Sequence, residues 1–439
     1  MAKDINNTAA NSNNSARKKH NPKLAMILSI LFAGLGQIYN RRYGKGLILI
    51  ILESAFLITL LEYVSTGFWG IRTLGEIPRV DHSILLLIQG LISLILVAFA
   101  VTIYVINIRD AYKEANEILD GKRRPKLREA IRHAWDTGFP YVFITPGFIM
   151  LIFVVLLPIM FMISLAFTNY NLYNSPPRKL LDWVGFDNFI NLVKIDIWSD
   201  TFFSVLAWTL VWTFVATTLQ VALGLFLALL VNDPRIKGKK IIRTILILPW
   251  AVPAFVTILI FAAMFNDSFG AINKDILIPL FGTKIPWLTD PTYTRLALIM
   301  IQTWLGFPFV FALFTGVLQS ISKDWYEAAD VDGGTRWQKF RFITLPHVLY
   351  ATAPLLIMQY TGNFNNFNII YLFNEGGPAV RGQNAGGTDI LISWVYKLTF
   401  DTNNYNMAAA ISLLIGLFVI TVAFFQFRRT RSFKEEGNI

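Results

Sequence analysis

Side-chain amides and hydroxyls recur inside two apolar stretches in the second half of the chain, residues 292–320 and 347–372. A buried amide offers both a hydrogen-bond donor and an acceptor without a charge to desolvate. Such groups suit a neutral ligand rich in hydroxyls, and intramembrane polar residues are functional hypotheses by default. The alternative interpretation is that they join helices, because Asn and Gln also hydrogen-bond across helices in membranes. The residues are Gln302, Thr303, Gln359, Asn363, Asn365 and Asn366.

A polar segment between those two stretches has the second distinctive pattern, Glu327-Ala328-Ala329-Asp330-Val331-Asp332-Gly333, and Ile343-Thr344-Leu345-Pro346 follows it. Ser322 is a candidate N-cap, Gly333-Gly334 permits a sharp turn, and Pro346 suits the start of a helix. These signals predict a short projecting helix. Its small alanines could seat in a groove of a partner, where Glu327 would meet an Arg or Lys. The alternative is an ordinary solvated loop.

Composition determines the fold class. Hydrophobic residues make up 54% of the 439 residues, charged residues only 15%, and the mean hydropathy is +0.51. These values indicate an all-α polytopic membrane protein, because backbone polar groups in lipid must be satisfied within helices. A spanning helix needs about 20 mainly apolar residues. Pro249 and Pro253 predict a kink in the fifth span. About eight transmembrane helices are expected: 46–64, 83–108, 141–167, 203–231, 241–265, 292–320, 347–372 and 406–427.

The distribution of the 39 Lys and Arg residues predicts the orientation, because cationic loops stay on the cytoplasmic side. With residue 1 inside, the inner segments carry 29 of them and the outer loops 10. Both termini and the Glu327 loop are therefore predicted to be cytoplasmic. The formal charge of +11 is then mainly a topology signal, and no nucleic-acid partner is expected, since Arg41-Arg42 and Lys122-Arg123-Arg124 flank apolar spans.

The chain divides into three predicted parts. Residues 1–23 are polar and predicted to be a disordered cytoplasmic N-terminus. Residues 24–138 hold an interfacial or re-entrant segment from Leu24 to Tyr39, two spans and a charged cytoplasmic linker, in which Arg109 to His133 favours a solvated helix. Residues 139–439 hold six spans, with the Glu327 loop at 321–346.

Several chemistries are excluded or poorly supported. The chain has no cysteine, so thiolate metal sites and a Cys nucleophile are excluded. Its four histidines form no i,i+4 pair, so no metal site is expected. No G-x-x-x-x-G-K-[ST] motif occurs, so the chain has no ATP cofactor of its own, and we expect neither catalytic residues nor an enzyme.

Four motifs in fixed order carry a family resemblance. They are Leu248-Pro249-Trp250-Ala251-Val252-Pro253, Thr303-Trp304-Leu305-Gly306-Phe307-Pro308, the Glu327 loop with its Ile343-Thr344-Leu345-Pro346, and Asn363-Phe364-Asn365-Asn366-Phe367. Residues 139–439 thereby resemble the six-helix core of permease subunits of ATP-binding-cassette importers, in particular the larger permease of the maltose/maltodextrin type. The resemblance implies a bacterial cell-membrane protein that imports maltose- or maltodextrin-type oligosaccharides. Galacto-oligosaccharides and other glucosides remain the alternative substrates.

The same resemblance implies two sets of site residues. Gln302, Phe309 and Gln359 differ in type from the best-known member of the family, so the sugar stays open. The coupling positions, which would contact the ATPase, are Glu327, Ala328, Ala329, Asp332 and Gly333. The substrate-binding positions are Gln302, Leu305, Gly306, Phe309, Gln359, Asn363 and Asn366.

Partners follow from the resemblance as well. It implies a second, homologous permease subunit, a cytoplasmic ATPase dimer that binds the ATP, and an extracytoplasmic sugar-binding protein. The rival class is an ion-coupled secondary transporter, which needs a buried charge within its spans. The predicted spans hold few charges: Glu53 and Glu62 in the first span and, near span ends, Arg243 and Arg295. A membrane scaffold without a solute path would leave the amides and the Glu327 motif without a role.

Overall fold

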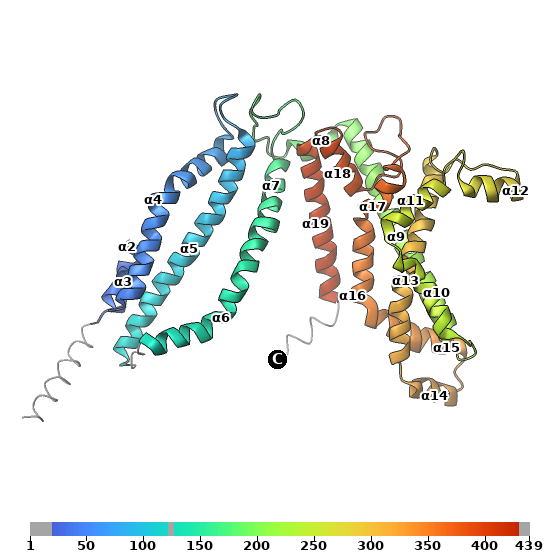
Figure 1. The fold of residues 1–439 in the computed structure, drawn as a ribbon, viewed down its shortest axis with the longest axis horizontal. Helices are drawn as coiled ribbons and strands as arrows, with labels where there is room; N and C mark the ends of the chain where they lie inside the picture. Colours follow the sequence, from blue (N-terminus) through green and yellow to red (C-terminus); the bar gives the residue numbers. More distant parts are fainter. Residues whose placement is uncertain (1–19, 122–126, 430–439) are drawn as a thin grey trace, which may run out of the picture. The chain divides into compact units, whose positions relative to one another are not determined.

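The computed structural model describes residues 20–121 and 127–429 of the chain (Figure 1). These residues fall into two compact units, Met1–Trp183 and Val184–Ile439. In the described ranges the secondary structure is helical, apart from two isolated bridges, Thr168 with Trp183 and Ala379 with Gly386. The predicted all-α fold class is thus confirmed. The predicted disorder of the N-terminus falls largely on residues 1–19, outside the described part.

The first unit contains two long helices, α4 and α5, with a short helical hairpin before them and a bent helix after them. A π-helical turn, η1, joins α6 to α7. The elements are α2 (Pro22–Leu31), α3 (Leu35–Tyr39), α4 (Tyr43–Thr73), α5 (Ser83–Leu119), α6 (Leu127–Leu151), η1 (Ile152–Leu156) and α7 (Leu157–Ala166).

Helices α2 and α3 form a hairpin where the sequence predicted an interfacial or re-entrant segment. Polar side chains attach it to α5: Gln37 Nε2 donates to the Asn107 carbonyl at 3.0 Å, and Asn40 Nδ2 donates to the Ala111 carbonyl at 2.8 Å. Gln37 and Asn40 are fully buried, so these bonds satisfy groups that would otherwise be costly. Helix α5 itself continues past Arg109 to Leu119, so the expected solvated helix from Arg109 is partly an extension of this span.

Small residues let α4 and α5 approach closely. A Cβ on Gly67 would lie 2.2 Å from the Ser93 Oγ, and one on Gly90 would lie 2.7 Å from the Gly67 carbonyl oxygen. Packing through glycine and serine is typical of helix pairs in lipid, where no hydrophobic force favours association. These contacts explain why Gly67 and Gly90 occur within spans.

The second unit holds the remaining helices. Its longest pair, α9 and α13, is followed by the short helices of the polar Glu327 segment. The elements are α8 (Asp187–Lys194), α9 (Asp196–Asn232), α10 (Lys239–Ala251), α11 (Ala254–Met264), η2 (Ile272–Leu277), α12 (Ile278–Phe281), α13 (Pro291–Ser320), α14 (Lys323–Val331), α15 (Arg336–Lys339), η3 (Phe340–Thr344), α16 (Leu345–Phe364), α17 (Phe367–Asn374), α18 (Leu391–Phe400) and α19 (Tyr405–Arg429).

Seven helices of the described residues are long and apolar enough to cross a membrane, and an eighth span results if the bent pair α10–α11 counts as one. Each coincides with one of the eight predicted apolar segments, so the predicted number of spans is confirmed. The pair α10–α11 bends by 85° at its break. Pro253 stands at the break and Val252 before it is extended, as expected for a residue that precedes proline.

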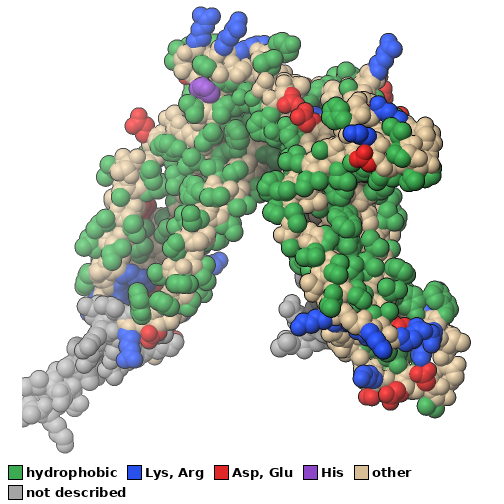
Figure 2. All heavy atoms as spheres, turned by 45° about the vertical axis from the view of Figure 1, so that its right-hand side comes forward, with side chains coloured by type: hydrophobic (Ala, Val, Ile, Leu, Met, Phe, Trp, Pro, Cys, Tyr) green, Lys and Arg blue, Asp and Glu red, His purple; other side chains and the backbone are tan. Residues whose placement is uncertain are grey.

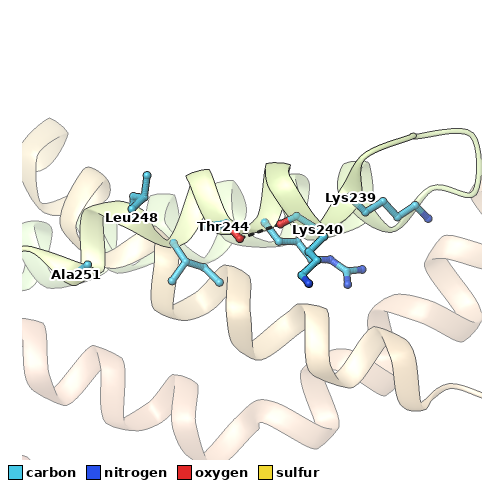
Figure 3. A pocket seen from close by; sticks show the side chains of 7 residues that line it. Lys239, Lys240, Thr244, Leu248 and Ala251 are labelled. Carbon is cyan, nitrogen blue, oxygen red and sulfur yellow. Dashed lines mark hydrogen bonds between the residues drawn. The ribbon is translucent and has the colours of Figure 1, made fainter.

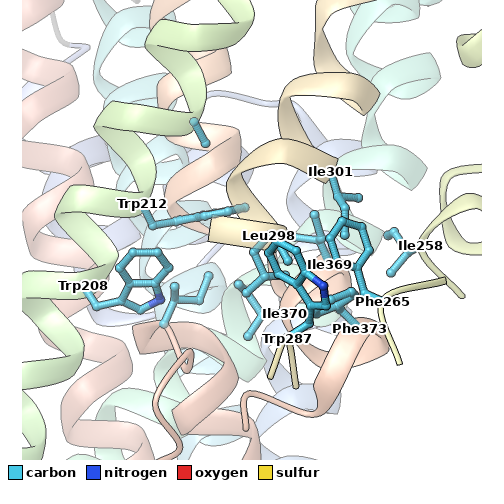
Figure 4. Close-up of a cluster of buried hydrophobic side chains, with 13 residues drawn as sticks. Trp208, Trp212, Ile258, Phe265, Trp287, Leu298, Ile301, Ile369, Ile370 and Phe373 are labelled. Atoms are coloured by element: carbon cyan, nitrogen blue, oxygen red, sulfur yellow. The ribbon is translucent and has the colours of Figure 1, made fainter. Parts of the chain in front are cut away.

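Aromatic and aliphatic side chains fill the second unit between α9, α11, α13 and α17 (Figure 4). Trp208 and Trp212 of α9 lie on one side of this cluster, and Phe265, Trp287 and Phe373 on the other. Phe265 meets Trp287 edge to face, with ring centroids 5.0 Å apart. In the space-filling view, green hydrophobic side chains cover the middle of the long helices and charged ones gather toward their ends (Figure 2). This distribution is the one that a bilayer requires.

Candidate functional site

The intramembrane amides predicted from the sequence join three helices of the second unit. Gln302 Nε2 on α13 donates to Asn363 Oδ1 on α16 at 2.7 Å. Asn363 Nδ2 in turn donates to Thr217 Oγ1 on α9 at 2.8 Å. Gln302 is 7% exposed and Asn363 is 3% exposed. These neutral groups therefore form one buried hydrogen-bonded cluster.

Gln220 of α9 is the residue that connects the cluster. Its Oε1 accepts from Asn363 Nδ2 and from Gln359 Nε2, each at 3.3 Å, and its Nε2 donates to the Gln302 carbonyl at 2.9 Å. The sequence analysis did not single out Gln220 or Thr217. The signal was available, because Gln220 is a polar residue inside the predicted span 203–231.

Gly306 of α13 lies directly against Gln220, and this close approach is possible only because glycine has no side chain. A Cβ at this position would lie 2.3 Å from Gln220 Cδ, closer than any real contact. Trp212 Nε1 completes the surroundings by donating to the Asn363 carbonyl at 2.9 Å. The geometry therefore brings together Gln302, Gly306, Gln359 and Asn363 of the predicted substrate positions.

The other three predicted substrate positions lie outside this cluster. Leu305 packs against the aromatic core around Trp208. Phe309 contacts Trp250 of α10 edge to face, with centroids 5.8 Å apart. Asn366 is half-buried and precedes α17 without a side-chain cap bond. No hydrogen bond of its side chain occurs among the described residues.

The Glu327 segment forms the short helix that its caps predict. The Ser322 Oγ accepts from the Asp324 amide at 3.2 Å at the start of α14. At the end of α14, Gly333 adopts a φ of +73°, which glycine reaches without strain. The Gly334 amide then donates to the Ala329 carbonyl at 2.7 Å and closes the turn.

Two side-chain contacts hold α14 against the next span. The Tyr326 hydroxyl pairs with Thr344 Oγ1 of η3 at 2.8 Å. Lys339 Nζ of α15 donates to Asp330 Oδ1 at 2.5 Å. A capping box between Thr335 and Gln338 then fixes the start of α15. The helix is thereby attached to α16, which carries Gln359 and Asn363.

The outer face of α14 is available for contact. Glu327 and Ala328 are exposed, Val331 is 89% exposed, and Glu327 has no ion pair in the part of the chain that the structure describes. Ala329 is half-buried, and Asp332 and Gly333 form the exposed end of the helix. A hollow of about 500 Å³ lies beside α14, and Trp325 and His347 on its wall meet edge to face at 5.4 Å.

The glycine-rich segment between α17 and α18 folds around a buried ion pair. Asp389 Oδ2 accepts from Lys397 Nζ at 2.6 Å and from the Gly386 amide at 2.7 Å. Its Oδ1 accepts from Ser393 Oγ at 2.8 Å. Burial raises the pKa of Asp389 above its ordinary value, although Lys397 and these hydrogen bonds oppose the shift. The segment is thus internally ordered.

Metal ligation has no candidate among the described residues, where no group of three His, Cys, Asp or Glu side chains could hold an ion. The amides and hydroxyls of the buried cluster are instead suited to a neutral ligand. The helix α14 is suited to protein contact.

Comparison with known proteins relates this chain to membrane components of transport systems. The family model "Binding-protein-dependent transport system inner membrane component" matches residues 220–432, which include both the amide cluster from Gln220 onward and α14. The chain is 54% identical over 416 residues to the galactooligosaccharides transport system permease protein GanP of Bacillus subtilis (strain 168), covering 94% of this chain and 99% of the relative.

A second relative is the maltodextrin transport system permease protein MdxF of the same organism, 48% identical over 421 residues, with 94% of this chain and 96% of the relative covered. Among solved structures, a bacterial ABC transporter involved in the import of the acidic polysaccharide alginate matches 70% of this chain and 99% of the compared chain, with a TM-score of 0.57 at 23% identity. That likeness concerns the fold. The chain therefore belongs to the family of binding-protein-dependent transport system inner membrane components, and it is a multi-pass permease subunit of an ATP-binding-cassette importer and not an enzyme.

Proposed function

We propose that this permease forms half of the translocation path for a neutral oligosaccharide, with Gln302, Gln359 and Asn363 as its solute-binding groups. The observation that carries the proposal is the buried amide cluster, in which three helices contribute neutral donors and acceptors to one point. A sugar hydroxyl both donates and accepts, so it can replace an amide–amide bond without leaving a buried polar group unpaired.

The charges of the spans support an uncharged solute. Glu53 of α4 accepts a hydrogen bond from the Ala33 amide at the turn of the N-terminal hairpin. Arg295 lies near the end of α13, where its Nε donates to the Gly387 carbonyl at 2.8 Å. Both charges thus have structural contacts that involve no residue of the amide cluster. An ion-coupled secondary transporter would place a charge at the solute site.

Two substrate classes are the candidates. GanP is named for galactooligosaccharides and MdxF for maltodextrins, and both align with this chain over almost their full length. Maltose and maltodextrins are the substrates that the family resemblance of the sequence implies. The higher identity to GanP, 54% against 48%, favours testing galactooligosaccharides in parallel with them. Both are neutral polyhydroxyl chains, which supports a role for the amide cluster in binding either of them.

The exposed helix α14 is the proposed contact with a cytoplasmic ATPase dimer. Its carboxylate at Glu327 would pair with a cation of that partner, and Val331 would enter an apolar groove. We also propose that α14 and both termini are on the cytoplasmic side, as the distribution of Lys and Arg along the chain predicts. A second permease subunit would supply the other half of the path, and an extracytoplasmic binding protein would deliver the sugar.

The test is sugar-stimulated ATP hydrolysis in proteoliposomes, with this permease co-expressed with the transporter subunits encoded beside it. Hydrolysis is measured with maltodextrins, galactooligosaccharides and a charged oligosaccharide as a negative control. We expect stimulation by one neutral class and none by the charged sugar. Stimulation by the charged sugar alone would contradict the proposed solute site.

A charge-reversal pair tests the coupling contact separately. Glu327→Lys is expected to abolish stimulation and co-purification of the ATPase, since it reverses an exposed carboxylate without removing an internal contact. The matched control is Asp275→Lys, an exposed carboxylate of η2 in the same unit. Equal loss in both variants, or an unchanged Glu327→Lys complex, would refute the coupling role of α14.

A further inference from the structure

The start of α10 forms a cationic pocket that neither the solute site nor the coupling helix uses (Figure 3). Its volume is about 620 Å³. Figure 3 shows Lys239 and Lys240 at one end and Leu248 and Ala251 at the other, along a single helix. The lining residues are Lys239, Lys240, Arg243, Thr244, Ile247, Leu248 and Ala251.

Two cations of this pocket have hydrogen-bond partners that are neutral. Lys239 Nζ donates to the Asn232 carbonyl at 3.1 Å, and Arg243 Nη2 donates to Asn232 Oδ1 at 2.6 Å. Gln319, with its amide oxygen turned toward Arg243, accepts from the guanidinium at 3.3 Å. These acceptors are neutral, so they position the cations without compensating them. Among the described residues, no carboxylate forms an ion pair with Lys239, Lys240 or Arg243.

Other cations of the second unit, Arg235 and Lys339, form ion pairs with carboxylates. Arg235 is paired with Asp233 at 2.5 Å, and its guanidinium holds the pKa of Asp233 well below the usual range. Lys339 is paired with Asp330. The uncompensated charge on the pocket wall therefore contrasts with paired cations nearby. A pocket of this kind attracts an anion from outside the chain.

The lining of the pocket changes from cationic to apolar along α10. Ile247, Leu248 and Ala251 continue the pocket beyond the cations, and α10 is part of a candidate membrane span. From Lys239 to Ala251 the helix rises by about 18 Å. A phospholipid matches this order, because its phosphate would meet the cations and its hydrocarbon chain would extend over the apolar residues for a similar length. A soluble acidic partner would match the cations but not the apolar part that lies within the span.

We propose that this pocket binds an anionic phospholipid, with its phosphate against Lys239, Lys240 and Arg243 and one acyl chain along Ile247, Leu248 and Ala251. Clustered Lys and Arg side chains at the cytoplasmic end of a transmembrane helix attract anionic headgroups, and each cation near the membrane surface adds to the attraction. The lipid would cover an apolar wall and neutralise the cations in one binding event.

The test is native mass spectrometry of the purified full-length chain titrated with phosphatidylglycerol or phosphatidylcholine. We expect selective retention of phosphatidylglycerol by the wild type. Lys240→Gln should weaken it by about fivefold, and Lys240→Gln with Lys239→Gln by about 25-fold, because each cation contributes a similar increment. Lys237→Gln is the matched control, since Lys237 is an exposed cation of the same loop outside the pocket.

A second variant distinguishes binding in the pocket from a general attraction of anionic lipid to the cations. Ala251→Trp fills the apolar end and leaves all cations in place, so it should reduce phosphatidylglycerol retention as Lys240→Gln does. Equal retention of both lipids, or an equal effect of Lys237→Gln, would overturn the proposal. Displacement of the lipid by millimolar inorganic phosphate, or by the purified ATPase, would assign the cations to an anion or a protein contact instead.

Discussion

The Nε2 of Gln302 donates to the Oδ1 of Asn363 at 2.7 Å, which joins α13 to α16 inside the second unit. The two residues are 61 positions apart and lie in the spans that bracket α14. The bond lies within the proposed solute site, and α16 connects it to the proposed coupling contact, because Tyr326 of α14 pairs with Thr344 at the start of α16. The first predictions concern the residues of this connection.

Asn363→Ala should lower the sugar-dependent transport rate by at least tenfold and reduce stability by about 1–3 kcal/mol, because Gln302, Gln220 and Thr217 lose a buried partner. Uptake by the full transporter and thermal unfolding of the chain measure the two effects. Asn365→Ala is the control, since Asn365 is exposed at the end of α16. A double-mutant cycle with Gln302→Ala should give a coupling energy of about 0.6–1.7 kcal/mol. Additive effects would refute the link.

Gly306→Ala should destabilise the chain by about 1–3 kcal/mol and impair transport, because the new methyl group would displace the Gln220 amide. Gly316→Ala on the same helix is the matched control, since its Cβ would meet no atom within 4 Å. Thermal unfolding of both variants in detergent measures the difference in stability between them. If the two substitutions have the same effect, helix propensity rather than contact with Gln220 is responsible.

Tyr326→Phe should reduce sugar-stimulated ATP hydrolysis several-fold while leaving the sugar concentration at half-maximal stimulation unchanged. The hydroxyl attaches α14 to η3 at 2.8 Å and does not touch the amide cluster. Tyr350→Phe is the control, because Tyr350 is 66% exposed at the same end of α16. A change in the half-maximal sugar concentration would instead indicate an effect on the solute site.

Lys397→Met should make the melting temperature of the protein depend more strongly on pH. Burial already raises the pKa of Asp389 above 3.8, and loss of the lysine raises it further. A carboxyl group whose folded pKa is raised contributes stability that is fully present below its unfolded pKa and is lost as pH rises through the folded pKa. The variant should therefore melt at a higher temperature at about pH 5 than at about pH 8.

The double variant Lys397→Met with Asp389→Asn is the control for this prediction, because it has no carboxyl group to titrate at the site. Its melting temperature should vary with pH less than that of Lys397→Met. Persistence of the same pH dependence in the double variant would assign the effect to another group. The segment around Gly386, which Asp389 anchors, should also become accessible to protease in Lys397→Met at high pH.

The parts of the fold that depend on local chemistry could be predicted from the sequence. Eight spans follow from apolar length, and the bounds of α14 follow from Ser322 and Gly333. The contact of Gly306 with Gln220 could not be predicted, since it depends on how α9 and α13 pack. Pro253 indicated a kink, but only tertiary structure sets its size of 85°. The buried position of Asp389 is likewise a property of the folded loop.

The π-helical turn η3, Phe340–Thr344, stands between α15 and α16. A π turn holds one residue more than an α turn, and one residue of an α-helix corresponds to a rotation of about 100°. If η3 were to rewind as α-helix, the face of α16 that carries Gln359 and Asn363 would turn by about that angle relative to α14. Torque applied at the Glu327 helix would then reach the amides as a twist about the axis of α16, and the span would lengthen only by the rise of one residue, about 1.5 Å.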